Sequence, residues 1–366
     1  MSSSLLIQSA DALQPWLERW SQKSWLAVDT EFVRVDTYRP KLCLIQIGDG
    51  EHDVCIDTLA IADLAPLYAL LNRRDILKLF HAASQDLEIF VELSGTCPAP
   101  IFDTQTAATL LGLGDQLGYA ALVERRCGVT LDKSLTRTDW SRRPLSEAEL
   151  DYAALDVRYL AQMYPSLRDE LLAQNRLAWL EEDCARAAVA ENYRNDPREA
   201  WRRLKGLARV APHGQVIAAA LAQWREEEAQ RRNRPRKWIV EDDALYRMAE
   251  RAPEDMTQLE GLGVLPAKTL ARHGETLLRL IAEARQQPPR TLASDERMAP
   301  EIKARMTRLQ EAVRRIAAAL NLPASVLAPR ADLEALALDG AQARANVLGG
   351  WRREVAGAEL LKLLAA

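Results

Sequence analysis

The sequence predicts an α/β domain, a mixed sheet flanked by helices, followed by two all-helical domains. Short strands rich in Val, Ile and Leu fill much of the first 105 residues and then alternate with helical segments. From about Ser146 apolar residues recur at helical spacing almost throughout. Breaks in this pattern at 192–206 and 286–295 predict domains at 1–195, 209–288 and 291–366.

The α/β part is predicted element by element from its patterning. Strand-forming runs are separated by turn residues, and Gly48–Asp49–Gly50 is a hairpin signal between the second and third of them. The predicted strands are 25–32, 41–50, 52–59, 76–82 and 100–104, and the predicted helices are 62–72, 84–93 and 105–111.

Two helical pieces in the second half are interpreted as diverged copies of one unit. At an offset of 88 residues, the turn Asn233-x-Pro235 recurs as Asn321-x-Pro323, each time before a helical segment. Chance identity in an Ala- and Leu-rich chain is the alternative.

Composition excludes several classes of protein. The 366 residues are 48% apolar and 27% charged, as in ordinary globular proteins. No apolar run approaches the ~18 residues of a membrane helix, and no secretory signal is apparent at the start. The five cysteines are scattered and never form C-x-x-C, which argues against a disulfide framework or a zinc site. We therefore expect reduced thiols, a cytoplasmic location and no membrane association.

The charge is unevenly distributed. Residues 1–200 have a net charge of −11, whereas residues 201–366 have a net charge of +7. A basic half is what binding to a polyanion requires, although solvated helix faces also carry arginine.

The strongest chemical signal is a set of acids. Asp29 and Glu31 lie two apart on a predicted strand, so both side chains point to one face of an apolar segment. A bound cation would remove their repulsion, and a solvent-facing strand edge is the alternative. Asp86 begins a predicted helix, and Tyr152 and Asp156 lie four apart on another. Each is ordinary alone, but together they can converge at one sheet edge.

Four carboxylates without His or Cys form an oxygen-only site that suits Mg²⁺ or Mn²⁺. Two such ions ~3.5–4 Å apart can clamp the attacking and leaving oxygens of a phosphoryl displacement. Tyr152, with a phenol pKa near 10 in model compounds, stays protonated and would orient the attacking water.

These segments resemble a known nuclease family. V-D-T-E-F, H-A-A-S-Q-D-L-E-I-F and Y-A-A-L-D are similar to the three motifs of DEDD-superfamily exonucleases of the Tyr-containing branch, and most closely to bacterial ribonuclease D. The resemblance implies a ribonuclease H-like fold and a 3′→5′ exoribonuclease that releases nucleoside 5′-monophosphates and trims tRNA precursors and small stable RNAs. It implies metal-binding roles for Asp29, Glu31, Asp86 and Asp156, and a water-positioning role for Tyr152.

The helical half resembles the HRDC domain over 216–262, and 293–366 resembles a degenerate copy. A basic run around the N-x-P turn is a candidate RNA contact. For the nearby Trp224 and Trp238 we favour core positions. The run consists of Arg231, Arg232, Arg234, Arg236 and Lys237.

Further RNA contacts are considered near the acids. A basic-aromatic stretch before the last motif would hold a phosphate and stack a base, with an anchored surface loop as the alternative. Its members are Lys133, Arg137, Trp140 and Arg143. His81 and Gln85 are weaker candidates, for which a core histidine and a solvated helix residue are the alternatives.

Two other functions remain open from the sequence. One is a DNA 3′→5′ exonuclease, since the acids do not read the 2′-hydroxyl, and the other is a non-catalytic RNA-binding adaptor. No G-x-x-x-x-G-K-[ST] occurs, so no nucleotide cofactor is expected. We expect a monomer.

Overall fold

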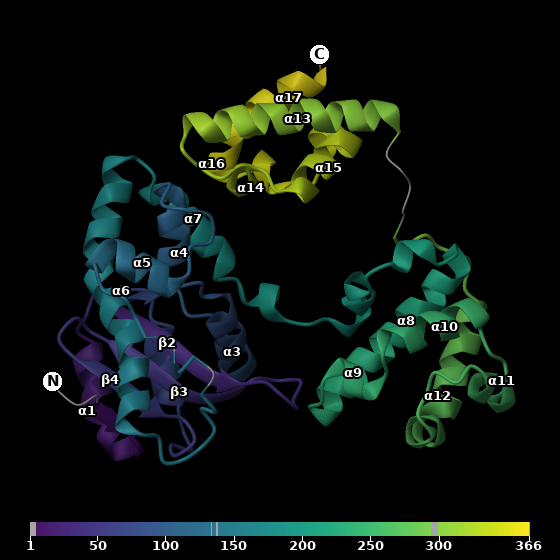
Figure 1. Cartoon of the computed structure of the whole chain (residues 1–366), viewed down its shortest axis with the longest axis horizontal. Helices are drawn as coiled ribbons and strands as arrows, with labels where there is room; N and C mark the ends of the chain where they lie inside the picture. Colours follow the sequence, from purple (N-terminus) through teal and green to yellow (C-terminus); the bar gives the residue numbers. More distant parts are fainter. Residues whose placement is uncertain (1–4, 133, 137, 294–298, 366) are drawn as a thin grey trace. The chain divides into compact units, whose positions relative to one another are not determined.

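The computed structural model describes residues 5–132, 134–136, 138–293 and 299–365 (Figure 1). The chain forms two compact units. The first contains Met1–Val33, Leu42–Tyr193 and Met298–Ala366, and the second contains Arg34–Lys41 and Arg194–Arg297. The C-terminal helices thus share a unit with the sheet, whereas the sequence predicts three separate domains.

The first unit is built on a mixed sheet, as the sequence predicts, but the described residues form six strands where five were predicted. The strand order is β1-β4-β3-β2-β5-β6. The β3–β4 pair is an antiparallel hairpin, whereas β1–β4, β2–β5 and β5–β6 are parallel. The strands are β1 (Leu5–Ile7), β2 (Trp25–Val33), β3 (Lys41–Gly48), β4 (Asp53–Asp57), β5 (Leu77–Phe80) and β6 (Ile101–Asp103).

Helices flank this sheet, and the long helix α6 runs across one of its faces (Figure 1). The predicted strands and helices of the α/β part are all present, but β1, α1 and α5 were not predicted from the sequence. The helices are α1 (Ala10–Trp20), α2 (Ala65–Leu71), α3 (Ser84–Ser94), α4 (Thr104–Leu110), α5 (Tyr119–Cys127), α6 (Glu147–Ala173), α7 (Leu177–Ala187) and the 3₁₀ turn η1 (Ala190–Tyr193).

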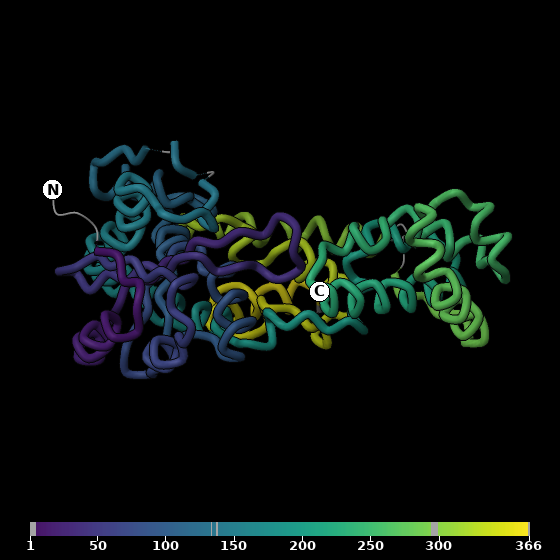
Figure 2. Tube along the Cα trace, turned by 90° about the horizontal axis from the view of Figure 1, so that it is seen from below, coloured from purple at the N-terminus to yellow at the C-terminus, as the bar shows by residue number. Residues whose placement is uncertain are grey.

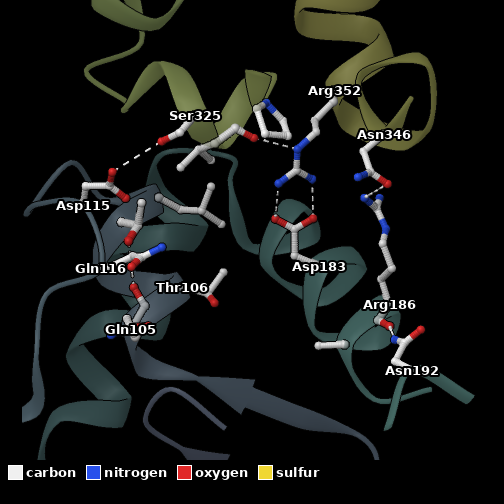
Figure 3. Close-up of a pocket in the computed structure, with 15 residues that line it drawn as sticks. Gln105, Thr106, Asp115, Gln116, Asp183, Arg186, Asn192, Ser325, Asn346 and Arg352 are labelled. Atoms are coloured by element: carbon white, nitrogen blue, oxygen red, sulfur yellow. Dashed lines mark hydrogen bonds and ion pairs between the residues drawn. The ribbon is translucent and has the colours of Figure 1, made fainter. Parts of the chain in front are cut away.

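The C-terminal helices pack against α7 through a small polar-aromatic contact. Trp351 stacks on Trp179 with ring centroids 4.4 Å apart and planes 6° apart. Arg352 forms a two-pronged ion pair with Asp183, and both side chains are largely buried (Figure 3). A cavity of about 630 Å³ lies beside this pair, where Ser325 donates to Asp115. These helices are therefore fixed to the sheet-bearing part of the unit.

The elements of this C-terminal segment are mostly short. They are α13 (Pro300–Ala319), α14 (Ala324–Leu327), α15 (Arg330–Asp339), η4 (Gly340–Gln342), η5 (Asn346–Leu348), α16 (Gly350–Arg352), the π-helical turn Arg353–Gly357 and α17 (Ala358–Ala365).

The second unit is helical and includes the connection between β2 and β3. Figure 2 shows this purple connection extending to the teal helix α8. Tyr38 is buried there and donates to Glu226 of α8. The helices are η2 (Pro197–Arg203), η3 (Leu207–Arg209), α8 (Pro212–Arg232), α9 (Arg236–Ile239), α10 (Asp242–Arg251), α11 (Met256–Gly261) and α12 (Ala267–Arg285).

The internal repeat predicted from the sequence is visible in the elements. The helices α8, α9 and α10 are followed 88 residues later by α13, α14 and α15, with matching or nearly matching lengths. In both copies the turn residue, Asn233 or Asn321, has a positive φ of 49° or 53°. Asparagine tolerates this left-handed conformation better than most residues, which explains its recurrence.

The tryptophan prediction for this region is half wrong. Trp224 packs against the core of the second unit, as expected. Trp238 is 61% exposed, because Ile239 and Val240 supply the apolar contacts of α9 instead. The guanidinium of Arg234 lies 5.7 Å from the ring centroid of Trp238.

Among the described residues no helix is long and apolar enough to cross a bilayer.

The Arg352–Asp183 pair predicts a stability effect. Replacing Asp183 with Ala leaves a largely buried arginine without its carboxylate, so we expect the free energy of unfolding to fall by about 3 kcal/mol. The double variant Asp183→Leu/Arg352→Met should recover most of the loss. Urea denaturation measures both, and Arg315→Met, which breaks the more exposed pair with Glu359, should change stability by less than about 0.5 kcal/mol. Equal losses in both single variants would contradict the role of the pair.

Candidate active site

Two acids come from the strand β2. Asp29 and Glu31 are separated by one residue and therefore point to the same sheet face. A carboxylate oxygen of each lies within 4.8 Å of the other and of an oxygen of Asp156. The structure thus brings together three acids that the sequence predicts to converge.

Asp156 and Tyr152 come from α6, which crosses the face of the sheet. A capping box fixes the start of this helix, because the Ser146 hydroxyl accepts from the Glu149 N–H and Glu149 accepts from the Ser146 N–H. Tyr152 and Asp156 are four positions apart, so both lie on one side of α6. The predicted helix therefore delivers both groups to the acids of β2.

Asp86 lies in the first turn of α3, immediately after β5. Asp103 fixes this turn by accepting the backbone N–H groups of Ala82 and Ala83. Asp86 is buried and accepts a hydrogen bond of 2.5 Å from the Thr30 hydroxyl. Asp86 is not one of the three acids whose carboxylate oxygens lie within 4.8 Å of one another. Its negative charge nevertheless contributes to the raised pKa of each of the three, after burial.

The electrostatics of the four acids are those of a site that needs positive charge. Burial, followed by repulsion from Asp156, Asp86 and Glu31, raises the pKa of Asp29 well above its usual value. Burial is also the largest cause for the other three. It raises the pKa of Glu31 to about 8 and the pKa values of Asp86 and Asp156 to about 7.

Tyr152 borders a cavity of about 400 Å³ together with Asp156. Burial raises the pKa of its hydroxyl, so the group stays protonated at neutral pH. The cavity is within the usual size range of small-ligand sites. Its lining residues are Gly118, Tyr119, Ala120, Ala121, Leu131, Asp132, Thr136, Tyr152, Leu155 and Asp156.

Tyr119 was not singled out from the sequence. Its hydroxyl donates to the carbonyl oxygens of Leu155, at 2.9 Å, and of Asp156. This contact ties α5 to the turn of α6 that carries the acid. No sequence signal pointed to this role, because Tyr119 belongs to none of the motifs and its helix α5 was not predicted.

The structure contradicts the base-stacking role predicted for Trp140. Its ring is buried and stacks on Tyr152, with centroids 6.3 Å apart and planes 29° apart. Trp140 supports Tyr152 from behind and presents no free face to a nucleotide. Lys133 and Arg137, from the same predicted stretch, lie outside the described residues.

The structure also argues against a phosphate contact by Arg143. Its five N–H groups bond to both oxygens of Asp57 and to the carbonyls of Cys43, Trp140 and Arg142. No N–H remains for RNA, and the side chain instead anchors the loop before α6.

His81 and Gln85 lie near the start of α3 with different exposures. His81 is half-buried, shares a 2.9 Å hydrogen bond with Thr104, and has a pKa lowered by burial. Gln85 is exposed. An RNA contact by either residue stays a prediction.

The basic run of the second unit is largely engaged with acids. Arg231 and Arg232 both pair with Glu228, and Arg236 forks onto Glu226. Arg234 bonds to the carbonyl and carboxylate of Asp36. Lys237 is exposed. Their binding of RNA stays a prediction.

Comparisons with known proteins identify the family. A 3′-5′ exonuclease family model matches residues 5–172, and an HRDC domain model matches residues 215–281. The chain is 37% identical over 364 residues to ribonuclease D of Pseudomonas paraeruginosa, covering 98% of this chain and 96% of that protein. The chain belongs to the ribonuclease D family.

Other relatives agree with this assignment. Ribonuclease D of Granulibacter bethesdensis is 39% identical over 370 residues, covering 99% of this chain and 92% of that protein. The crystal structure of Escherichia coli RNase D, described as an exoribonuclease involved in structured RNA processing, superposes with a TM-score of 0.90 and 32% identity over 99% of this chain and 98% of that one. The chain is accordingly a 3′→5′ exoribonuclease, as the sequence predicted, and its family depends on divalent metal.

The raised pKa values of the acids predict how the stability of the metal-free protein depends on pH. A carboxyl group with a higher pKa in the folded protein than in the unfolded chain holds its proton longer when folded. The free energy of unfolding contributed by these groups therefore falls as pH rises from about 4, the unfolded value, to about 8.

In chelator, we expect the melting temperature to fall as the pH is raised from 5 to 8. Asp29→Asn should make the fall shallower and raise the melting temperature at pH 8, because it removes one of the repelling charges. Differential scanning calorimetry across this range provides the test, with the exposed Asp11→Asn as control. If the Asp29→Asn and Asp11→Asn profiles coincide, the acid cluster does not carry the repulsion described above.

Proposed function

We propose that Asp29, Glu31, Asp86 and Asp156 hold two divalent ions, Mg²⁺ or Mn²⁺, and that Tyr152 positions the attacking water. The observation that carries this proposal is the convergence of acids from β2, α3 and α6, three of which have carboxylate oxygens within 4.8 Å of one another and all of which have raised pKa values with burial as the largest cause. Their donor atoms are all oxygen, which fits hard divalent cations.

Each part of the site has a separate task in hydrolysis. When bound, such ions lower the pKa of water and stabilise a leaving oxygen. The carboxylates would hold the ions, and so fix the position of their positive charge relative to the scissile phosphate. The protonated Tyr152 hydroxyl orients the water that attacks phosphorus, and the leaving 3′ oxygen stays with the shortened strand. The released product is then a nucleoside 5′-monophosphate.

For the substrate, we propose tRNA precursors with 3′ extensions, bound by a monomer. The cavity beside Tyr152 has room for a terminal nucleotide, and the HRDC domain supplies a second helical surface. The repeat of α8–α10 in α13–α15 supports a second, degenerate HRDC domain in the C-terminal segment.

Acid substitutions should separate cleavage from binding. Asp29→Asn and Asp156→Asn are expected to slow release of nucleoside 5′-monophosphates by about 10³-fold or more, because several kcal/mol of charge stabilisation are lost. Tyr152→Phe should cost about 10²-fold. Single-turnover assays on a labelled RNA measure the rates, and fluorescence anisotropy measures RNA affinity, which should be unchanged. Asp29→Asn cleaving at the rate of the Asp11→Asn control would refute the assignment.

Matched RNA and DNA oligonucleotides test the substrate class. We expect faster digestion of RNA than of DNA of the same sequence, and trimming of a 3′-extended tRNA that stops when a chelator is added. Identification of the released nucleotides by chromatography checks the direction and the product. Faster digestion of DNA would instead support a DNA exonuclease of the same superfamily.

A further inference from the structure

Gln46 on β3 is a fully buried side chain whose two amide atoms lack a hydrogen-bond partner among the described residues. Leaving both a donor and an acceptor unsatisfied in the interior lowers stability, whereas an apolar side chain of this size would not. Buried polar groups in folded proteins are usually paired. The packing of the sheet therefore does not explain why an amide side chain occupies this position.

The register of the sheet shows which way Gln46 points. Gln46 lies opposite Cys55 in the antiparallel β3–β4 pair, so both side chains are on the same sheet face. Cys55 packs with Ala153 and Ala154 of α6, and its thiol contacts the carbonyl of Leu150. Gln46 thus points toward α6.

Two contacts of neighbouring residues locate the amide along α6. Cys55 meets the helix at Leu150, while two residues along β3 a Cβ added to Gly48 would lie 3.2 Å from Cβ of Val157. Gln46 is directly opposite the residue that makes the first contact and two residues from the one that makes the second. The part of α6 nearest Gln46 therefore lies between Leu150 and Val157, the stretch that contains Tyr152 and Asp156.

Two of the acids lie on the strand next to the strand that carries Gln46. β3 is hydrogen-bonded to β2, the strand of Asp29 and Glu31, and these two acids approach Asp156 of α6. Cys55 lies opposite Gln46 across the strand pair, and burial, followed by nearby acids that include Glu31 and Asp156, raises the pKa of its thiol. The unpaired amide is thus placed beneath α6 and one strand away from the acids of β2.

We propose that Gln46 is a positioning residue for the acid cluster. In the metal-loaded enzyme its Nε2–H₂ group donates to a carboxylate oxygen that does not face the ions, directly or through one buried water. Such outer contacts orient metal-ligating carboxylates and commonly change metal affinity by about 10–100-fold. This inference rests on the proposed metal-binding role of the acids and adds a residue that the sequence motifs do not contain.

The proposal predicts opposite effects on stability and on metal binding. Gln46→Met and Gln46→Leu keep the size of the side chain and remove the unpaired amide. In chelator we expect melting temperatures equal to or above that of the wild type. The dissociation constant for Mn²⁺, measured on the full chain without RNA by electron paramagnetic resonance, should rise about tenfold or more.

A neighbouring residue on the other sheet face gives the matched control. Ile45 is equally buried and adjacent in sequence but points away from Gln46. Ile45→Val should lower the melting temperature by about 2–4 °C and leave Mn²⁺ affinity unchanged.

The outcomes are distinct. Mn²⁺ affinity within twofold of the wild type in both Gln46 variants overturns the proposal, whatever their melting temperatures. Weaker affinity together with a lowered melting temperature also overturns it, because that combination indicates general disruption of the sheet. If the wild-type chain binds Mn²⁺ no better than Asp29→Asn, the proposed metal site itself fails, which is a separate result.

Discussion

The repulsion among four carboxylates, one buried and three half-buried, is the constraint around which the catalytic unit is organised. Ionised acids this close in a low-dielectric pocket would normally take up protons or move apart. They do not move apart here, because rigid elements hold them: an interior strand, a capped 27-residue helix and a helix start pinned by Asp103. The fold therefore carries an electrostatic cost that the divalent ions proposed above would relieve.

That cost requires compensation elsewhere in the unit. A continuous apolar core surrounds the sheet and continues into the C-terminal helices, whose buried residues belong to the same cluster. The stacked pair Trp179–Trp351 and the ion pair Arg352–Asp183 attach these helices to α7. The C-terminal helices thus enlarge the hydrophobic core that supports the site, a role independent of any contact they make with RNA.

The sequence predicted those features that depend on local pattern. Alternation on 25–32 predicted that Asp29 and Glu31 share a face, and helical spacing predicted the same for Tyr152 and Asp156. What it could not predict depends on which element lies next to which. Trp140 looked like a stacking platform because it lies among basic residues, yet Tyr152 covers its ring. Arg143 looked available for phosphate, yet Asp57, 86 residues away in the chain, takes its donors.

The same distinction applies to the basic half of the chain. Its net charge of +7 was read from composition, and the arginine run around Asn233 looked like its functional centre. Arg231 and Arg232 pair with Glu228 within α8, and Arg236 at the start of α9 pairs with Glu226 of α8, so three of those arginines already have acidic partners. Long-range attraction of a polyanion depends on net charge and survives such pairing, whereas direct phosphate contact does not. The net positive charge of this half is therefore compatible with the predicted RNA binding even though the arginines are paired, and Lys237 and Trp238 are exposed.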